Sequence, residues 1–129
     1  MKTVAMVLFP DFLLLDMAGP MEVFSIANRY LTPDDHYRLC TVGTQHEAIR
    51  ASNGVRVMAD VPMEQAAGVH DLLLVPGGPG AYDEKHQPLV RWLLRRQPLV
   101  SRLRHRLLLN HPVTHRMRRV LRCSLRQRP

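Results

Sequence analysis

The sequence is poor in the features that mark secreted, metal-binding and membrane proteins. Its 129 residues contain two cysteines, Cys40 and Cys123, which lie far apart and outside any Cys-x-x-Cys or Cys/His ligand spacing. Neither a disulfide framework nor a zinc site is therefore indicated. No apolar stretch approaches the roughly 18 residues that span a bilayer, since Asp11 interrupts the first one. We expect a cytoplasmic protein without a metal, a cofactor or a membrane segment.

Acidic residues are absent from the last third of the chain. All eleven lie within residues 1–84, which carry a net charge of −6, whereas residues 85–129 carry Lys85, twelve arginines and no acid, a net charge of +13. Such a basic block is typical of nucleic-acid or acidic-membrane binding. A helix that reads a DNA groove normally interleaves polar and aromatic side chains with its arginines, and no aromatic residue follows Trp92. The basic charge thus belongs to the tail.

Short apolar runs alternate with helical patterns, which predicts an α/β fold with a mainly parallel sheet. Strands are expected at 3–9, 37–42 and 71–76, a hairpin at 53–59, and helices at 20–31, 63–67 and 88–96. The continuous apolar run at 3–9 is typical of a strand buried on both faces. We expect the functional loops at the carboxyl ends of the strands.

The first helix is predicted to begin at Gly19-Pro20, because proline is tolerated in the first helical turn. Pro20, Phe24, Ala27 and Leu31 then recur at spacings of four, three and four. This spacing gives the helix an apolar stripe for packing on the sheet.

Two blocks of the sequence resemble the ThiJ/PfpI superfamily. They comprise Phe9-Pro10-Asp11-Phe12 with Leu15 to Phe24, and then Tyr37-Arg38-Leu39, Ser52-Asn53-Gly54-Val55 and Asp71 to Gly78. The resemblance covers residues 3–98 and implies a three-layer, flavodoxin-like sandwich of the class I glutamine amidotransferase type. The stretch around Ala18-Gly19-Pro20 is most similar to the amino-terminal domain of AraC-type transcriptional regulators, with isocyanide hydratases as near relatives.

The resemblance implies a non-catalytic domain that senses a small-molecule effector, forms a homodimer and signals to carboxy-terminal helix-turn-helix modules. Contact with DNA would be made only through those modules, which are absent from this sequence. Asp16 matches the carboxylate beside the catalytic cysteine of hydratase-type members, and Gly77-Gly78 match the loop whose N–H groups stabilise an oxyanion. Simpler roles stay open: Asp16 could support the turn or cap the helix, and the glycines could form a tight turn.

The catalytic cysteine of the family has no counterpart in this sequence. Family members carry it at a strand-to-helix elbow about thirty residues beyond the Pro-Gly-Gly loop. The corresponding residues of this chain, 99–109, contain neither cysteine nor glycine. Cys40 lies inside a predicted strand as a small core residue, and Cys123 lacks the elbow. We therefore expect no enzyme activity, with a cysteine-dependent hydratase or hydrolase as the alternative. We expect the three histidines of the tail to be solvated side chains: His105, His111 and His115.

Residues 99–129 lose the periodicity of residues 1–98, and two explanations stay open. A frameshift near codon 99 would leave a truncated domain with an incomplete sheet, because out-of-frame GC-rich coding sequence yields mostly Arg, Leu, Pro, Ser and His. Alternatively, the tail is native and binds nucleic-acid phosphates. Met117, Leu121 and Leu125, spaced by four, would then line a basic surface helix.

Overall fold

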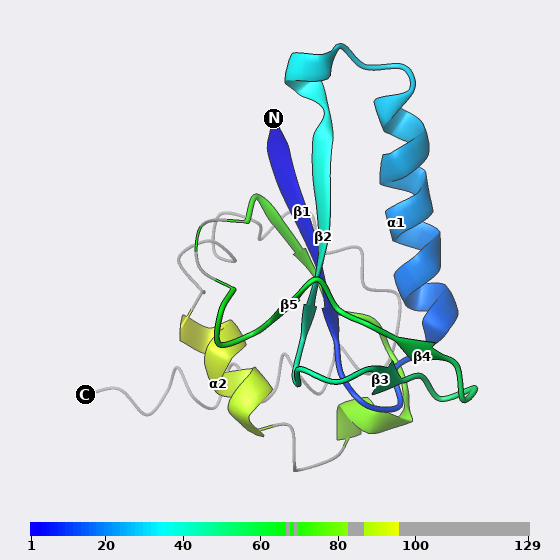
Figure 1. Ribbon diagram of the computed structural model, residues 1–129, viewed down its shortest axis with the longest axis vertical. Helices are drawn as coiled ribbons and strands as arrows, with labels where there is room; N and C mark the ends of the chain where they lie inside the picture. Colours follow the sequence, from blue (N-terminus) through cyan, green and yellow to red (C-terminus); the bar gives the residue numbers. More distant parts are fainter. Residues whose placement is uncertain (67, 69, 83–86, 96–129) are drawn as a thin grey trace.

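A computed structural model describes residues 1–66, 68, 70–82 and 87–95 of the chain (Figure 1). Predictions for residues 99–129, which include the basic helix and Cys123, lie outside these residues. The elements in chain order are β1 (Lys2–Leu8), α1 (Leu14–Asn28), η1 (Pro33–Asp35), β2 (Tyr37–Gly43), β3 (Ile49–Arg50), β4 (Arg56–Val57), β5 (Val61–Pro62), β6 (Leu72–Leu74), η2 (Pro79–Tyr82) and α2 (Gln87–Arg95), where η marks a 3-10 helix.

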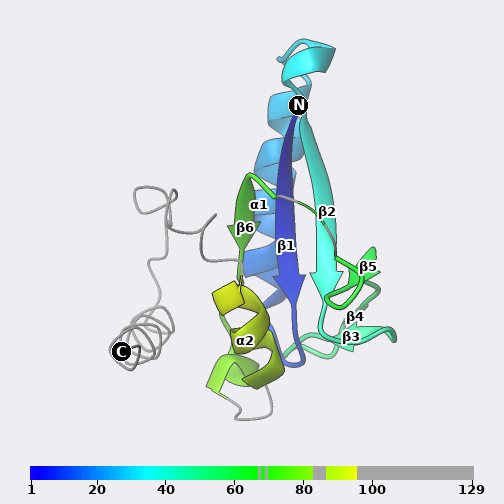
Figure 2. The same ribbon diagram turned by 90° about the vertical axis from the view of Figure 1, so that its left-hand side faces the viewer.

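Four parallel strands form the main sheet in the order β5-β2-β1-β6 (Figure 2). β1 pairs with β2 along its whole length, from Lys2 opposite Tyr37 to Leu8 opposite Gly43. On its other edge β1 pairs in parallel with β6. β3 and β4 form a separate antiparallel pair, so a hairpin is present, but its first strand precedes the range predicted for it at 53–59. The predicted α/β fold with a mainly parallel sheet is confirmed.

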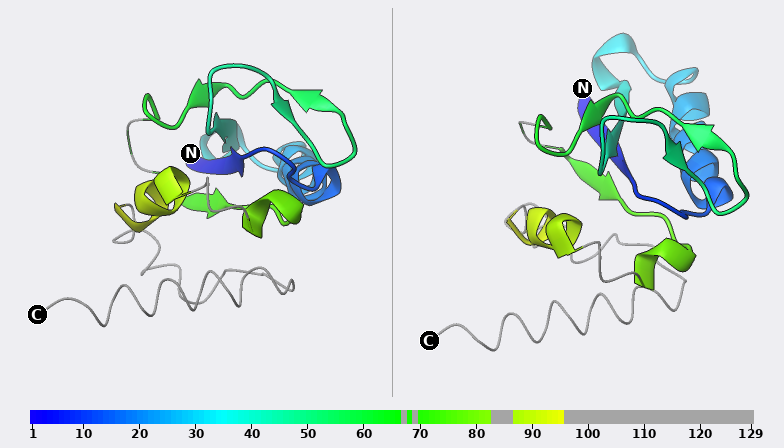
Figure 3. Two further views of the ribbon diagram at one scale, coloured as in Figure 1. Left: turned by 90° about the horizontal axis from the view of Figure 1, so that it is seen from below. Right: turned by 60° about the horizontal axis from the view of Figure 1, so that its bottom comes forward.

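Helices α1 and α2 cover opposite faces of the sheet, with α1 on one side of β1 and α2 on the other (Figure 3). Because β1 is also paired along both edges, each residue from Val4 to Phe9 is at most 1% exposed. Phe12 on the loop after β1, Leu89 and Trp92 on α2 join the same core. A strand in this position must be apolar throughout, which explains the continuous run in the sequence.

Helix α1 begins at Leu14, six residues before the predicted start, and Pro20 lies inside it. Leu14, Met17 and Met21 pack against the core and extend the apolar face toward the amino terminus of the helix. A proline at this position cannot donate a hydrogen bond to the preceding turn. The packing of Leu14 and Met17 before the proline, and of Met21 after it, offsets that loss, so the helix continues through the proline.

The carboxyl end of α1 is attached to the first residue of β2. The Asn28 side chain donates a hydrogen bond to the Tyr37 carbonyl oxygen at 2.9 Å and accepts one from the Tyr37 N–H at 2.7 Å. The rings of Phe24 and Tyr37 also meet edge to face, with centroids 4.9 Å apart. α1 therefore ends at Asn28, and Leu31, which was expected to complete its apolar stripe, is exposed.

The helix predicted at 63–67 is replaced by turns, and residue 67 lies outside the described part of the chain. Val61–Pro62 instead join the sheet edge as β5, and the Met63 N–H donates to the Gly43 carbonyl. The N–H groups of Gln65 and Ala66 both donate to Pro62, which closes one tight turn. Because Val61, Pro62 and Met63 are bound to β2, the predicted helix does not begin at Met63.

Replacing Asn28 by alanine should lower the free energy of unfolding by about 1–2 kcal/mol, because both hydrogen bonds to Tyr37 are lost. Urea denaturation followed by circular dichroism measures this change. Ser25→Ala on the same helix is the control, with an expected change below about 0.5 kcal/mol. Equal effects of the two substitutions would show that the Asn28 bridge contributes nothing specific.

Candidate functional site

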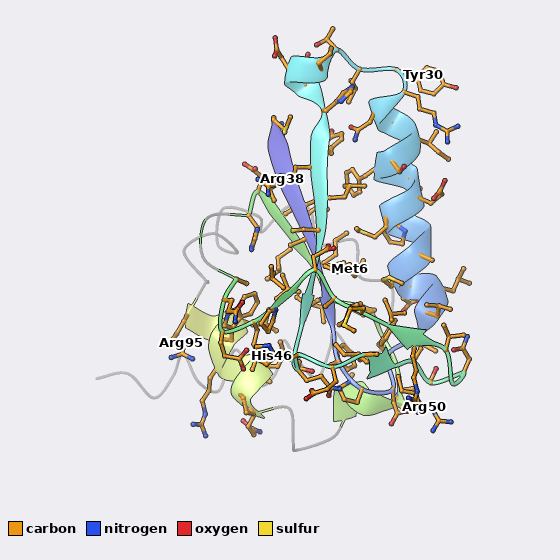
Figure 4. All side chains as sticks on the ribbon, in the orientation of Figure 1. Met6, Tyr30, Arg38, His46, Arg50 and Arg95 are labelled. Carbon is orange, nitrogen blue, oxygen red and sulfur yellow. The ribbon has the colours of Figure 1, made fainter. Side chains whose placement is uncertain are left out.

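Three loops meet where β1, β2 and β6 end, beside the start of α1 (Figure 1). The Asp11 N–H donates to the Arg50 carbonyl at 2.8 Å, and the Ser52 N–H donates to the Phe12 carbonyl at 2.9 Å. These two bonds fix the β3–β4 hairpin to the loop after β1. In Figure 4 the Arg50 side chain is seen at this end of the molecule. The arrangement agrees with the rule that parallel sheets carry their sites at the carboxyl ends of strands.

The structure brings the three predicted site residues together. Asp16, in the first turn of α1, accepts a hydrogen bond from the Gly77 N–H through Oδ2 at 2.9 Å, across 61 residues of sequence. The neighbouring Leu13 N–H donates to the Gly77 carbonyl at 2.8 Å. Asp16 does not cap its own helix, since the cap residue is Leu13, without a side-chain hydrogen bond. Its carboxylate supports the Gly77-Gly78 turn instead.

Glycine is required at two positions of this loop because the backbones touch. A Cβ atom on Gly78 would collide with the Asp11 carbonyl oxygen and lie 2.9 Å from the Leu13 nitrogen, and Gly78 also has a φ of +141°. A Cβ atom on Gly80 would collide with the Pro10 carbonyl oxygen. Side chains are excluded here, so the loop after β6 can lie directly on the loop after β1.

The backbone N–H groups of Gly77, Gly78 and Gly80 differ in whether the protein itself supplies a hydrogen-bond acceptor. The Gly77 N–H is bound to Asp16, and the Gly80 N–H donates to the Asp11 carbonyl at 3.3 Å. The Gly78 N–H donates to no other residue in the described part of the chain, although Gly78 is buried. A buried N–H group without a protein acceptor is costly unless a water or ligand oxygen reaches it. Among the described residues, the Gly78 N–H is thus the donor of this turn that has no protein acceptor.

Cys40 lies in the middle of β2, opposite Ala5 of β1, and not at the carboxyl edge of the sheet. It is partly buried, it packs against the core, and its Sγ lies 3.8 Å from the Val4 carbonyl oxygen. Burial, and secondarily the Asp60 carboxylate, raise the pKa of the thiol, against a smaller opposing effect of Arg38. A neutral thiol inside a strand is a poor nucleophile, and the predicted role of Cys40 as a core residue fits these contacts.

The described residues contain no group of three His, Cys, Asp or Glu side chains that could hold a metal ion. Among the helices that the structure describes, none has the length and apolar character needed to cross a membrane. The docking of the hairpin on the loop after β1 was not predicted from the sequence. Asp11, whose φ is +61°, marks the sharp turn that makes this docking. The Pro10-Asp11 pair was the local signal for it.

Residues 2–101 match the DJ-1/PfpI family. An uncharacterised protein encoded in the cpoL 5′ region of Streptomyces lividans is 43% identical over 75 residues, which cover 58% of this chain and 50% of that protein. A thiJ/pfpI family protein from Bacillus anthracis is similar in structure, with a TM-score of 0.64, 19% identity, and coverage of 77% of this chain and 48% of that one.

An AraC family transcriptional regulator from Pseudomonas putida is also similar, with a TM-score of 0.60 and 21% identity over 74% of this chain and 49% of that one. At such identities the two structures establish the shared fold. This chain spans about half the length of each of these relatives.

Gly78→Ala should lower the free energy of unfolding by more than about 2 kcal/mol, because a Cβ atom there meets backbone atoms and the positive φ disfavours it. Gly19→Ala is a matched control with the opposite sign. Gly19 lies inside α1 with no heavy atom within 4 Å of an added Cβ, and alanine should stabilise the helix by about 0.5–1 kcal/mol. Urea titrations that order the variants otherwise would contradict the close loop contact.

Alkylation by iodoacetamide should report the raised pKa of Cys40. In a Cys123→Ser chain, we expect the rate to rise with pH through a midpoint above the ordinary pKa of a thiol, because burial makes the folded state hold the thiol proton more tightly. The same linkage lets Cys40 support stability below the thiol's ordinary pKa and withdraws that support at higher pH. Unfolding in urea should return the midpoint to its ordinary value. A midpoint in the folded chain below that of the unfolded chain would show an activated thiol instead.

Proposed function

Because the chain belongs to the DJ-1/PfpI family, we propose that it is a non-catalytic, ligand-sensing member, the sensor domain of an AraC-type transcriptional regulator. The observation that carries this proposal is the 2.9 Å hydrogen bond between the Gly77 N–H and the Asp16 carboxylate. In a catalytic relative the backbone donors of this loop would face an oxyanion. Here one of the two glycine donors is already occupied by the protein's own acid.

The remaining donor defines the ligand contact in this proposal. A small-molecule effector with a carbonyl or carboxylate oxygen would accept the Gly78 N–H, beside the Asp16 side chain that supports the turn. No thiol among the described residues stands at this edge of the sheet, because Cys40 lies within β2. Binding without a covalent step is the chemistry that these groups support.

The regulator part of the proposal is supported by the fold shared with the AraC family regulator from Pseudomonas putida. Since the chain spans about half the length of that protein, DNA contacts would belong to helix-turn-helix modules elsewhere in the longer regulator. The sensor would act as a homodimer and would work in the cytoplasm. Ligand binding near Gly78 would bias the geometry of that dimer.

A cysteine-dependent hydratase or hydrolase is the second candidate function. It is favoured by the juxtaposition of Asp16 with Gly77 and Gly78, which match the acid and the oxyanion loop of catalytic members. In that case the Asp16 carboxylate must leave the Gly77 N–H before an oxyanion can take its place. The enzyme reading also needs a thiol at this edge, which the described residues do not supply.

Turnover of an aryl isocyanide and release of ammonia from simple amides should stay at the buffer rate, with or without iodoacetamide, because no thiol among the described residues lies at the site. Absorbance and ammonia assays measure these rates, with an isocyanide hydratase as the positive control. Turnover that iodoacetamide abolishes would establish the enzyme and overturn the sensor.

The Asp16 contact is tested in the same preparation by hydrogen exchange at the Gly77 amide. Asp16→Asn keeps an acceptor oxygen and should keep the protection, whereas Asp16→Ala should speed exchange about tenfold or more. Equal exchange in the two variants would mean that Asp16 does not hold the loop.

A further inference from the structure

A cavity of about 630 Å³ lies between α2 and the turn after β5. Its volume falls within the range of small-molecule sites, about 300–1,000 Å³. We propose that this cavity binds a small amphipathic carboxylate, with the carboxylate on Arg91 and Arg95 and the apolar body against Trp92. The residues that line it are Met63, Glu64, Ala66, Pro88, Arg91, Trp92 and Arg95.

The floor of the cavity is apolar. Ala66 and Trp92 are 4% and 7% exposed and belong to the main core, and Met63 packs against that core. Behind the floor is the packed sheet, so it forms a fixed surface against which an aromatic or aliphatic group can lie. Burying such a group gains about 25 cal/mol per Å² of apolar surface, and an indole adds favourable ring contacts.

The rim of the cavity is charged and unpaired. Arg91 and Arg95 lie four residues apart on α2, and therefore on the same helical face. Neither arginine forms an ion pair or a side-chain hydrogen bond, and the same holds for Glu64 across the rim, in the part of the chain that the structure describes. Two like charges at this spacing destabilise a helix unless an anion lies between them. A guanidinium pair of this kind matches a carboxylate group.

The lining favours a monoanion with an apolar body over inorganic phosphate. Phosphate would leave the apolar floor unused, and its second charge would be repelled by Glu64. A carboxylate carries one charge and leaves the rest of the molecule to contact Trp92. A neutral amide of the same shape would keep the apolar contact and lose the charge-assisted hydrogen bonds, which are roughly twice as strong as neutral ones.

The cavity is separate from the site proposed above. It lies beside α2, and its lining includes neither Asp16 nor the Gly77-Gly78 turn, which stand at the start of α1. The inference therefore does not rest on the proposed sensor function. Asp16→Ala should leave binding in the cavity unchanged, so failure of one proposal can be told from failure of the other.

Trp92, the single tryptophan of the chain, lies in the cavity lining and makes its fluorescence a direct probe. We expect phenylacetate to change the emission of the full chain saturably and to bind about tenfold more tightly than phenylacetamide, its neutral analogue. Inorganic phosphate should give no saturable change at matched ionic strength. Equal affinities for phenylacetate and phenylacetamide, saturation by phosphate alone, or no saturable change with phenylacetate would each overturn the proposal.

Substitutions of surface residues can distinguish binding in the cavity from non-specific attraction of an anion to the positive charge of the chain. Arg91→Gln with Arg95→Gln should weaken phenylacetate binding about tenfold and leave phenylacetamide binding unchanged, whereas Glu64→Gln should tighten phenylacetate binding a few-fold. Arg29→Gln with Arg38→Gln removes the same charge at two exposed sites, and Figure 4 shows Arg38 far from Arg95.

This control pair should not change the affinity for phenylacetate. An equal loss in both double variants would show non-specific attraction and overturn the assignment. All the substituted side chains are exposed, so circular dichroism spectra should superimpose.

Discussion

The burial of β1 is the constraint on which the rest of the structure depends. This strand is hydrogen-bonded along both edges, by β2 and β6, and helices cover both of its faces. No side chain from Val4 to Phe9 reaches solvent appreciably, so the strand can carry no functional group. Its contribution is positional, because it delivers Asp11 and Phe12 to the edge where the loops of three strands meet. Functional groups can therefore lie only beyond the buried residues of this strand.

At that edge the backbone defines the site more than the side chains do. The turn at Gly77 and Gly78 rests on the loop after β1 through a close contact that a Cβ atom would prevent. Asp16 then fixes the turn from α1 by a hydrogen bond to a main-chain N–H group. This arrangement of main-chain groups around one carboxylate is the basis of the sensor role proposed above.

Local pattern was sufficient to predict the buried strand at 3–9 and the helix at 88–96, because each depends on neighbouring residues, and the alternation of strands with helices predicted the parallel sheet. It failed at the start of α1, since Pro20 is a strong local signal whereas the packing of Leu14 and Met17 is decided by the sheet. β5 has two residues, too few for a recognisable pattern. The bond between Asp16 and Gly77 spans 61 residues, and family resemblance alone pointed to both partners.

The cavity beside α2 could not be recognised from the sequence, because the many arginines of the tail mask the two that line it. Arg91 and Arg95 read as the beginning of a basic block, although they belong to a helix whose Leu89 and Trp92 are in the core. Net charge pointed to the whole of residues 85–129, which carry +13, and did not single out these two arginines. Charges beyond about 8 Å are largely screened at physiological ionic strength. The preference of the cavity for an anion is therefore set by the two arginines at its rim, against the single opposing charge of Glu64.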